Sequence, residues 1–509
     1  MGAEGRITAG PAAELVEAGY ALEIADAPLL HRGLTLADLA HLVELTECGA
    51  VKRAQAAPLC AALLDLLDVP AEQFPYDPVY GDAYNSRERE LERALGPAAG
   101  RLHLGRTRRE AGRIAFRIAL RDRLLALHDD LAGFAETLSD RAAEHAATLW
   151  PDSTYLQPAQ PSTFGHYLGG FAEQVLRHLE RAQVAFGRAD ISPAGAGGAG
   201  GTRVPLDRAR LAARLGFGSV GAHTRDAMWS ADCAVDAVMT AVQAAVTIGQ
   251  LAADLEIFAS PAFGYLTIDA SLCRASVLMP QKRNPYGLPV LRGGAATLLG
   301  RLTGLLATGL TPSARTDNWL YAYGETLGAV DLSDRLVRLA TVTAEGVCPD
   351  VEALADQAAR HFTGAADLAE ELTQRFGLDY RTAYRVVGRA VAAAVGRGEE
   401  VLSAGLVRAA AQEITGAPLP VGPDLLAEVT DPAAAVAARN APGGASTERV
   451  LEHARSVRAG AAAARSWSAG ERARITRAEA DLLAVARELA ISGGPAGPGG
   501  VPDGRNPAR

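Results

Sequence analysis

The chain has 509 residues, which is more than one hydrophobic core usually accommodates, so two or three domains are expected. Its composition is 49% hydrophobic but only 5% aromatic, and its richness in alanine and leucine argues against an all-β fold. The formal net charge of −9 argues against general nucleic-acid binding, because phosphate contacts need an excess of cations. The sequence therefore indicates a helical protein that acts on small molecules.

The N-terminal region predicts short, interrupted helices. Gly33, Pro58, Pro70 and Pro75 punctuate its apolar pattern, and such residues commonly end or kink helices. We therefore predict a separate N-terminal helical domain over residues 1–104.

The middle of the chain, residues 105–355, contains the most regular apolar pattern. Apolar side chains recur three and four residues apart in four stretches, namely 111–149, 168–186, 235–249 and 289–310. Long helices with such stripes bury them against one another. The pattern predicts a central bundle of long helices but indicates no chemistry.

Two shorter helical patterns follow, over residues 365–376 and 380–395. They predict a smaller C-terminal helical domain over residues 356–492. The remaining segment, 493–509, is rich in glycine and proline, and we expect it to be disordered because it cannot bury a core.

The five cysteines lie far apart without CxxC or zinc spacing, and the N-terminus lacks a basic region followed by an apolar signal core. No uninterrupted apolar run approaches the roughly 18 residues of a membrane span. We expect a soluble, cytoplasmic protein with no membrane contact, no metal site and no cofactor. The glycines of residues 195–201 do not form a phosphate loop, since the required Lys-Ser/Thr ending is missing.

Polar residues gather in three segments, 101–110, 154–166 and 275–285. The third reads Ala-Ser-Val-Leu-Met-Pro-Gln-Lys-Arg-Asn-Pro. It places a hydroxyl at Ser276, a cation at Lys282 and an amide at Asn284.

This third segment resembles the signature loop of the aspartase/fumarase lyase superfamily, Ser-Ser-x-Met-Pro-x-Lys-x-Asn-Pro. Residues 103–108 are similar to the His-Thr-Gly-Arg-Ser-Arg segment of argininosuccinate lyase. Residues 157–166 are similar to its Gln-x-Ala-Gln-Pro-x-Thr-Phe-Gly-His motif, and residues 260–265 also match this subfamily. The chain is identified as a divergent argininosuccinate lyase-like member of the superfamily.

The resemblance implies an all-α, three-domain fold whose central helices form a twenty-helix core in a homotetramer. Loops from three subunits would meet in each active site, so an isolated chain should be inactive. The expected substrate is a small anion.

The resemblance also implies roles for the matched residues. β-Elimination beside a carboxylate needs a base for a weakly acidic Cβ proton and cations for the dianionic intermediate. Ser276 matches the base, Lys282 can stabilise its alkoxide, and Asn284 can bind a carboxylate. The remaining residues matched to substrate contacts are Thr107, Arg108, Thr154, Gln160 and His103.

Two replacements alter the part of the site that assists the leaving group. Tyr155 stands where the family has a histidine that helps to protonate the leaving group, and Pro289 replaces the glutamate that orients this histidine. A phenol titrates near pH 10, so Tyr155 is either a weak acid or only a pocket-filling side chain.

Further differences concern substrate recognition. Arg109 replaces an asparagine that binds the succinyl group, which makes it a candidate for binding a substrate anion. With Arg113, Arg117 and Arg121 it forms a stripe spaced by four residues, and we expect the last two to be solvated or paired with acids. Segment 316–325 corresponds to the part that holds the arginine half of the family's substrate, but its pattern has changed. Tyr321 is predicted to contact the substrate there.

These observations predict a carbon–nitrogen lyase of amino-acid metabolism, or less favourably a C–O lyase. It would act on a succinyl- or aspartate-type substrate and release fumarate or a related unsaturated acid, with a leaving group other than arginine. One alternative is a non-catalytic binding or structural homologue. Another is an authentic argininosuccinate lyase in which Tyr155 is the acid.

Overall fold

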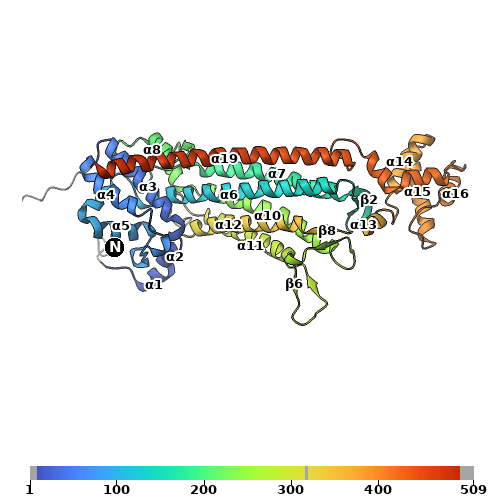
Figure 1. Ribbon diagram of the computed structural model, residues 1–509, viewed down its shortest axis with the longest axis horizontal. Coiled ribbons are helices and arrows are strands. Elements are labelled where there is room, and N and C mark those ends of the chain that lie inside the picture. The colour runs from blue at the N-terminus through green and yellow to red at the C-terminus, as the bar shows by residue number, and fades with distance from the viewer. Residues whose placement is uncertain (1–8, 316–318, 493–509) are drawn as a thin grey trace, which may run out of the picture.

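The computed structural model describes residues 9–315 and 319–492, and the predicted disordered tail lies outside these ranges. Figure 1 shows an elongated molecule. Short N-terminal helices lie at one end, long helices form the middle, and a group of small helices lies at the other end. Helices dominate the described residues, which confirms the predicted all-α fold.

The N-terminal end consists of short helices around one longer helix. The helices are α1 (Ala13–Leu15), α2 (Ala21–Ala25), α3 (Ala27–Glu47), α4 (Arg53–Asp65) and α5 (Ala83–Leu95). A π-helical turn spans Val16–Tyr20, and 3-10 turns span Ala71–Gln73, Pro78–Tyr80 and Gly96–His103. Helix α3 packs on the central bundle so closely at Gly33 that an added Cβ would lie 2.7 Å from the backbone of Ala115.

Six long helices form the bundle. They are α6 (Arg108–Glu144), α7 (Phe164–Ala189), α10 (Asp232–Phe258), α11 (Gly287–Thr308), α12 (Ala322–Glu345) and α19 (Thr447–Ile491). The apolar stripe predicted on α6 is buried in the bundle core, as are the corresponding side chains of α7. The four predicted long helices are therefore confirmed, whereas α12 and α19 were not predicted from the apolar pattern.

Helix α19 belongs to the range predicted as the C-terminal domain, but it packs along α6 and α7 and reaches α4 at the N-terminal end (Figure 1). The division into three domains stays a prediction. Helix α19 follows the small helices in the sequence but packs in the bundle, so the bundle is not one continuous stretch of the chain.

Helix α10 is the one helix among the described residues that is long and apolar enough to cross a membrane. In the bundle, 61% of its most apolar window is buried, and it packs against α7, α11 and α12. Its apolar composition therefore suits a core helix.

The small helices at the far end are α13 (Val351–Ala358), α14 (Ala365–Phe376), α15 (Tyr380–Val395), α16 (Ala404–Thr415), α17 (Pro423–Thr430) and α18 (Pro432–Ala438). Helices α14 to α17 share an apolar cluster of their own, whereas Leu354 of α13 belongs to the core of the long bundle. Helices α14 and α15 coincide with the two patterns predicted from the sequence. Leu372, Val386 and Val407 lie in their shared core.

Two-stranded pairings join several helices. They are the antiparallel pairs β1 (Leu149–Thr154) with β2 (Gln157–Thr163), β5 (Leu266–Ile268) with β8 (Val347–Pro349), and β6 (Arg274–Ala275) with β7 (Arg283–Asn284), and the parallel pair β3 (Ile191–Ser192) with β4 (Ser219–Val220). Short helices α8 (Arg208–Arg214) and α9 (Thr224–Trp229) and a 3-10 turn at Ala270–Leu272 are the remaining elements of the described residues. Two of the three polar segments are thus β-hairpins.

Candidate active site

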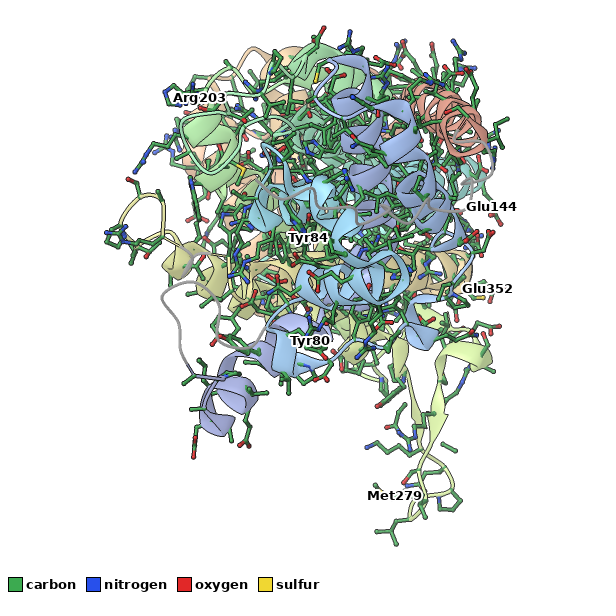
Figure 2. The ribbon with its side chains drawn as sticks, turned by 90° about the vertical axis from the view of Figure 1, so that its left-hand side faces the viewer. Tyr80, Tyr84, Glu144, Arg203, Met279 and Glu352 are labelled. Carbon is green, nitrogen blue, oxygen red and sulfur yellow. The ribbon has the colours of Figure 1, made fainter. Side chains whose placement is uncertain are left out.

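The serine segment is the loop of the β6–β7 hairpin, and it projects from the side of the molecule, with Met279 near its tip (Figures 1 and 2). The Ser276 hydroxyl oxygen accepts a hydrogen bond from the Met279 N–H at 3.0 Å. The Lys282 N–H donates to the Met279 carbonyl at 3.1 Å. These bonds fold the loop into a turn on which Ser276 is partly exposed and Lys282 is exposed.

The base of this hairpin is fixed more firmly than its tip. The Asn284 side-chain amide donates to the Arg274 carbonyl at 3.0 Å, and the Arg283 guanidinium donates to the Ile268 carbonyl at 2.5 Å. Val277 and Leu278, by contrast, are almost fully exposed. Exposed apolar side chains that gather beside polar groups are typical of interaction surfaces.

The second polar segment is the β1–β2 hairpin, whose two-residue loop consists of Tyr155 and Leu156. Both have positive φ angles, 55° and 58°, and the Tyr155 side chain is 98% exposed. Thr154 and Gln157 pair directly below the loop. The hairpin thus presents Thr154 and Tyr155 away from the body of the chain.

The root of this hairpin is buried in aromatic packing. Trp150 lies 5.0 Å from Tyr167 and 5.3 Å from Phe164, measured between ring centroids. Gln160 is exposed on β2, whereas the Thr163 hydroxyl caps α7 by accepting from the His166 N–H at 3.0 Å. A rigid root therefore supports an exposed tip.

The first polar segment ends at the start of α6. Thr107 is the N-cap of the helix, where its hydroxyl accepts from the Glu110 N–H and donates to the Gly197 carbonyl, both at 3.3 Å. Arg108 remains substantially exposed, and its Nε atom lies 3.6 Å from a carboxylate oxygen of Asp82. A guanidinium beside a helix N-terminus can bind a carboxylate, and Asp82 already offsets part of its charge.

His103 and Arg109, both predicted to bind substrate, already have protein partners. His103 lies 2.7 Å from Glu88 through Nε2 and 3.2 Å from the Tyr84 hydroxyl through Nδ1. Arg109 donates to Glu23 at 2.7 Å and is mostly buried. Either side chain would have to exchange a partner before binding a substrate anion.

Arg108 and Arg109 line one cavity together with acidic side chains. Glu23, Asp26 and Asp82 contribute the carboxylates. Burial raises the pKa of Asp26 to about 6, although its carboxylate accepts the Gly324 N–H at 2.9 Å. Glu23 contacts Arg109 at the start of α6 and Asp26 contacts Gly324 at the start of α12, so the N-terminal segment joins these two helix ends.

Tyr321 is half-exposed just before α12. Residues 316–318 of the same predicted segment lie outside the described ranges. Pro289 is exposed in the first turn of α11. N–H groups in a first turn have no partner within the helix, so a proline is tolerated there.

The arginine stripe on α6 is buried. Arg113 lies 3.9 Å above the centre of the Trp319 ring, and Arg117 donates to the Arg188 carbonyl at 2.7 Å. Arg121 donates to Asp190 at 2.7 Å and to the Gly216 carbonyl at 2.6 Å. The expectation of a solvated or acid-paired side chain is confirmed for Arg121 but is wrong for Arg117, because carbonyls at the C-terminus of α7 take the place of water and acids.

Several other titratable side chains belong to the core. His128 lies 3.2 Å from the Gln183 amide nitrogen, and His178 lies 2.8 Å from the Thr247 hydroxyl. Burial lowers the pKa of each histidine to about 4, so both are neutral near pH 7. In the described ranges, no group of three or more His, Cys, Asp or Glu side chains is suited to hold a metal ion.

Glu110 is a buried residue near the predicted site that motif reasoning missed. Its carboxylate accepts hydrogen bonds from the Gly195 and Gly197 N–H groups at 2.7 and 2.6 Å. The Thr-x-x-Glu spacing from Thr107 to Glu110 is a capping-box pattern and could have drawn attention to it. Its actual partners, however, come from a distant loop.

A single chain does not bring the three polar segments together. The start of α6 lies near the N-terminal end, the β1–β2 hairpin lies at the opposite end of the bundle, and the serine hairpin projects between them (Figure 1). The predicted site residues therefore form three separate groups on one chain.

Known proteins resemble this chain over nearly its whole length. The lyase family model matches residues 37–300, and the argininosuccinate lyase C-terminal model matches residues 362–437. Argininosuccinate lyase from Methanoculleus marisnigri is 31% identical over 460 residues, which cover 89% of this chain and 92% of that protein. Argininosuccinate lyase 1 from Mesorhizobium japonicum is 32% identical over 393 residues, covering 77% and 84%.

Solved structures give the same relationship. EDDS lyase in complex with formate superposes with a TM-score of 0.85 at 25% identity, covering 97% of this chain and 99% of that one. A variant of EDDS lyase with bound fumarate gives the same values. Class II fumarase from Schistosoma mansoni, at 12% identity and a TM-score of 0.67 over 80% and 90% of the chains, shares the fold. The chain therefore belongs to the argininosuccinate lyase family of carbon–nitrogen lyases, within the fumarase/aspartase superfamily.

Proposed function

We propose that this lyase eliminates an amine other than arginine from an N-substituted aspartate and releases fumarate. A base removes the Cβ proton, the electrons of that C–H bond form the C=C bond, and the Cα–N bond breaks. The amine nitrogen leaves with the bonding electron pair and takes up a proton. The fumarate bound to the EDDS lyase variant supports this product class.

The observation that carries this proposal is the complete serine hairpin, with Ser276, Lys282 and Asn284 all present. A serine hydroxyl is a poor base unless its alkoxide is stabilised. The Ser276 oxygen already accepts the Met279 N–H, and a nearby cation would add to this stabilisation. We assign Ser276 as the base, Lys282 as the stabilising cation and Asn284 as a carboxylate ligand.

Arg108 and Thr107 are the proposed anchors for a substrate carboxylate, because this arginine is accessible at the start of α6. Arg109 is a weaker candidate, since Glu23 already neutralises its charge. Thr154, Gln160 and Tyr321 are exposed and complete the proposed contacts.

The separation of the three segments in one chain supports a homotetramer in which three subunits contribute to each site (Figure 1). The exposed Val277 and Leu278 on the serine hairpin support the same assembly. We further propose a cytoplasmic enzyme of amino-acid metabolism, because the relatives are argininosuccinate lyases.

The leaving group is proposed to differ from arginine because Tyr155 and Pro289 replace the usual histidine and glutamate. An amine that departs with only weak acid assistance would suit this arrangement. The altered segment around Tyr321 also favours a different group on the nitrogen.

A substrate panel tests the leaving group. Purified protein would be incubated with argininosuccinate and with aspartates carrying other N-alkyl or N-aminoalkyl groups, and fumarate would be followed by proton NMR. We expect at least one other aspartate to exceed argininosuccinate in kcat/KM. Preference for argininosuccinate would establish the authentic activity, and binding without release of fumarate from any member would identify a non-catalytic homologue.

A further inference from the structure

The glycine-rich segment 193–202 folds against the start of α6, where Thr107 and Arg108 lie. Glu110 connects the two: its side chain is buried, with 1% exposure for the residue, and its two carboxylate oxygens each accept one glycine N–H. The carbonyl of Gly197 in turn accepts the Thr107 hydroxyl. A continuous chain of hydrogen bonds therefore runs from Glu110 through Gly197 to Thr107.

The backbone of this segment requires glycine where it meets Glu110. Gly195 and Gly197 have φ angles of 74° and 65°, which side chains other than glycine rarely adopt. A Cβ added to Gly197 would lie 2.6 Å from the Gly201 carbonyl oxygen. A side chain with only one acceptor oxygen would leave one of these two buried glycine N–H groups without a hydrogen bond.

Two more hydrogen bonds hold the exposed side of the segment. The Trp229 indole N–H donates to the Gly198 carbonyl at 2.9 Å, and the Thr224 hydroxyl donates to the Ala199 carbonyl at 2.7 Å. Both donors come from α9, so the segment is held between α6 and α9. The bonds to Glu110 and the bond from the Thr107 hydroxyl to the Gly197 carbonyl join the segment to the helix turn that carries Thr107 and Arg108.

We infer that Glu110 is a positioning residue for substrate binding, which fixes Thr107 and Arg108 through the glycine-rich segment 193–202. The inference rests on the proposed function, in which these two residues hold a substrate carboxylate. Glu110 itself is buried beneath the segment and acts through its hydrogen-bond partners.

The charge state of Glu110 gives this role a pH dependence. Burial raises the pKa of Glu110 to about 7, while Arg106 before α6 and Arg208 at the start of α8 oppose the shift. Arg106 is itself paired with Asp38 of α3. The ionised carboxylate accepts both glycine N–H groups, whereas protonation turns one oxygen into a donor. Substrate binding should therefore weaken as the pH falls through about 7.

Glu110→Gln tests the inference because it keeps the side-chain size but presents an amide group to one glycine N–H. We expect KM to rise about tenfold, the factor that corresponds to about 1.4 kcal/mol, with kcat changed by less than about threefold. The wild-type KM should rise from pH 8 to pH 6, and the variant should lose this dependence. Glu110→Asp, which restores the charge, should recover part of the affinity.

Glu136→Gln is the matched control, since Glu136 lies on the same helix but pairs with Arg465 at the surface. Its KM and pH profile should match those of the wild type. If the wild type is active and folded Glu110→Gln has the wild-type KM and pH profile, the inference about Glu110 is overturned while the proposed function stands. If that variant does not fold, a wild-type KM that is constant between pH 6 and pH 8 would overturn it, and a KM that rises on acidification would support it. Failure of the wild type to release fumarate would instead refute the proposed function.

Discussion

Tyr155 combines an unfavourable backbone conformation with an exposed side chain. Its φ of 55° and that of Leu156 at 58° place both residues in a hairpin loop that usually contains Asn and Gly. A left-handed conformation costs a non-glycine residue on the order of 1 kcal/mol. Retention of a tyrosine where asparagine would fit better favours a function for its side chain over pocket filling.

Tyr155→Phe separates these two interpretations, because it keeps the ring and removes the hydroxyl. If the phenol protonates the leaving amine, kcat should fall about 100-fold, within the range typical of lost acid–base catalysis. Steady-state kinetics on the preferred substrate would measure this. Tyr380→Phe, at an exposed tyrosine of α15, is the control. An unchanged kcat in Tyr155→Phe would show that the hydroxyl donates no proton.

At the scale of single elements, α6 shows what the sequence could and could not predict. Its apolar stripe from Leu120 to Leu138 predicted the buried face correctly, because helical periodicity is a local property. The burial of Arg117 and Arg121 could not be predicted in this way. Their acceptors lie at the ends of α7 and α8, about 70 to 95 residues away in sequence, and equal spacing also occurs on solvated faces.

In the candidate site, too, local motifs could be recognised in the sequence, whereas the three-dimensional arrangement could not. The motif at residues 275–285 predicted Ser276 and its neighbours, but it did not predict a projecting hairpin. The Tyr-Leu loop of the β1–β2 hairpin lacks the Asn-Gly or Asp-Gly signal that would have identified its turn. Glu110 was missed because its glycine partners become neighbours only in the folded chain.

Asp190→Asn tests the buried ion pair that joins α6, α7 and α19. Asp190 accepts from Arg121 at 2.7 Å and from Arg474 at 2.6 Å. Loss of its charge leaves the buried Arg121 uncompensated, so the free energy of unfolding should fall by about 3 to 5 kcal/mol in urea titrations. Asp140→Asn, at an exposed pair with Arg458, should cost less than about 1 kcal/mol. Equal effects of the two substitutions would contradict this account.

At the scale of the whole molecule, the long bundle keeps the three polar segments apart (Figure 1). Apolar side chains also remain exposed along it, including Val246 on α10 and Leu299 and Leu306 on α11. Helices of a bundle normally bury such side chains against a neighbour. Both features fit the proposed tetramer, in which other subunits would cover these faces and supply the missing segments.

Mixed oligomers test whether the sites are shared. Arg108→Ala and Ser276→Ala chains should each be inactive alone. When both chains assemble together, about one quarter of randomly assembled sites should receive Arg108 and Ser276 from chains that carry them intact, since a symmetric assembly repeats the same contact. Co-expression with two affinity tags, followed by activity assays, would measure the recovery. No recovery in verified mixed tetramers would show that each site takes both residues from one chain.

The most direct test of the central claim is fumarate formation by Ser276→Ala at saturating substrate, followed by proton NMR. The account predicts that kcat falls at least about 1,000-fold, because no base removes the Cβ proton, while the fold and substrate binding persist. Ser466→Ala, at an exposed serine of α19, should retain wild-type activity. A Ser276→Ala enzyme that still forms fumarate within about tenfold of the wild-type rate would contradict the assignment of Ser276 as the base.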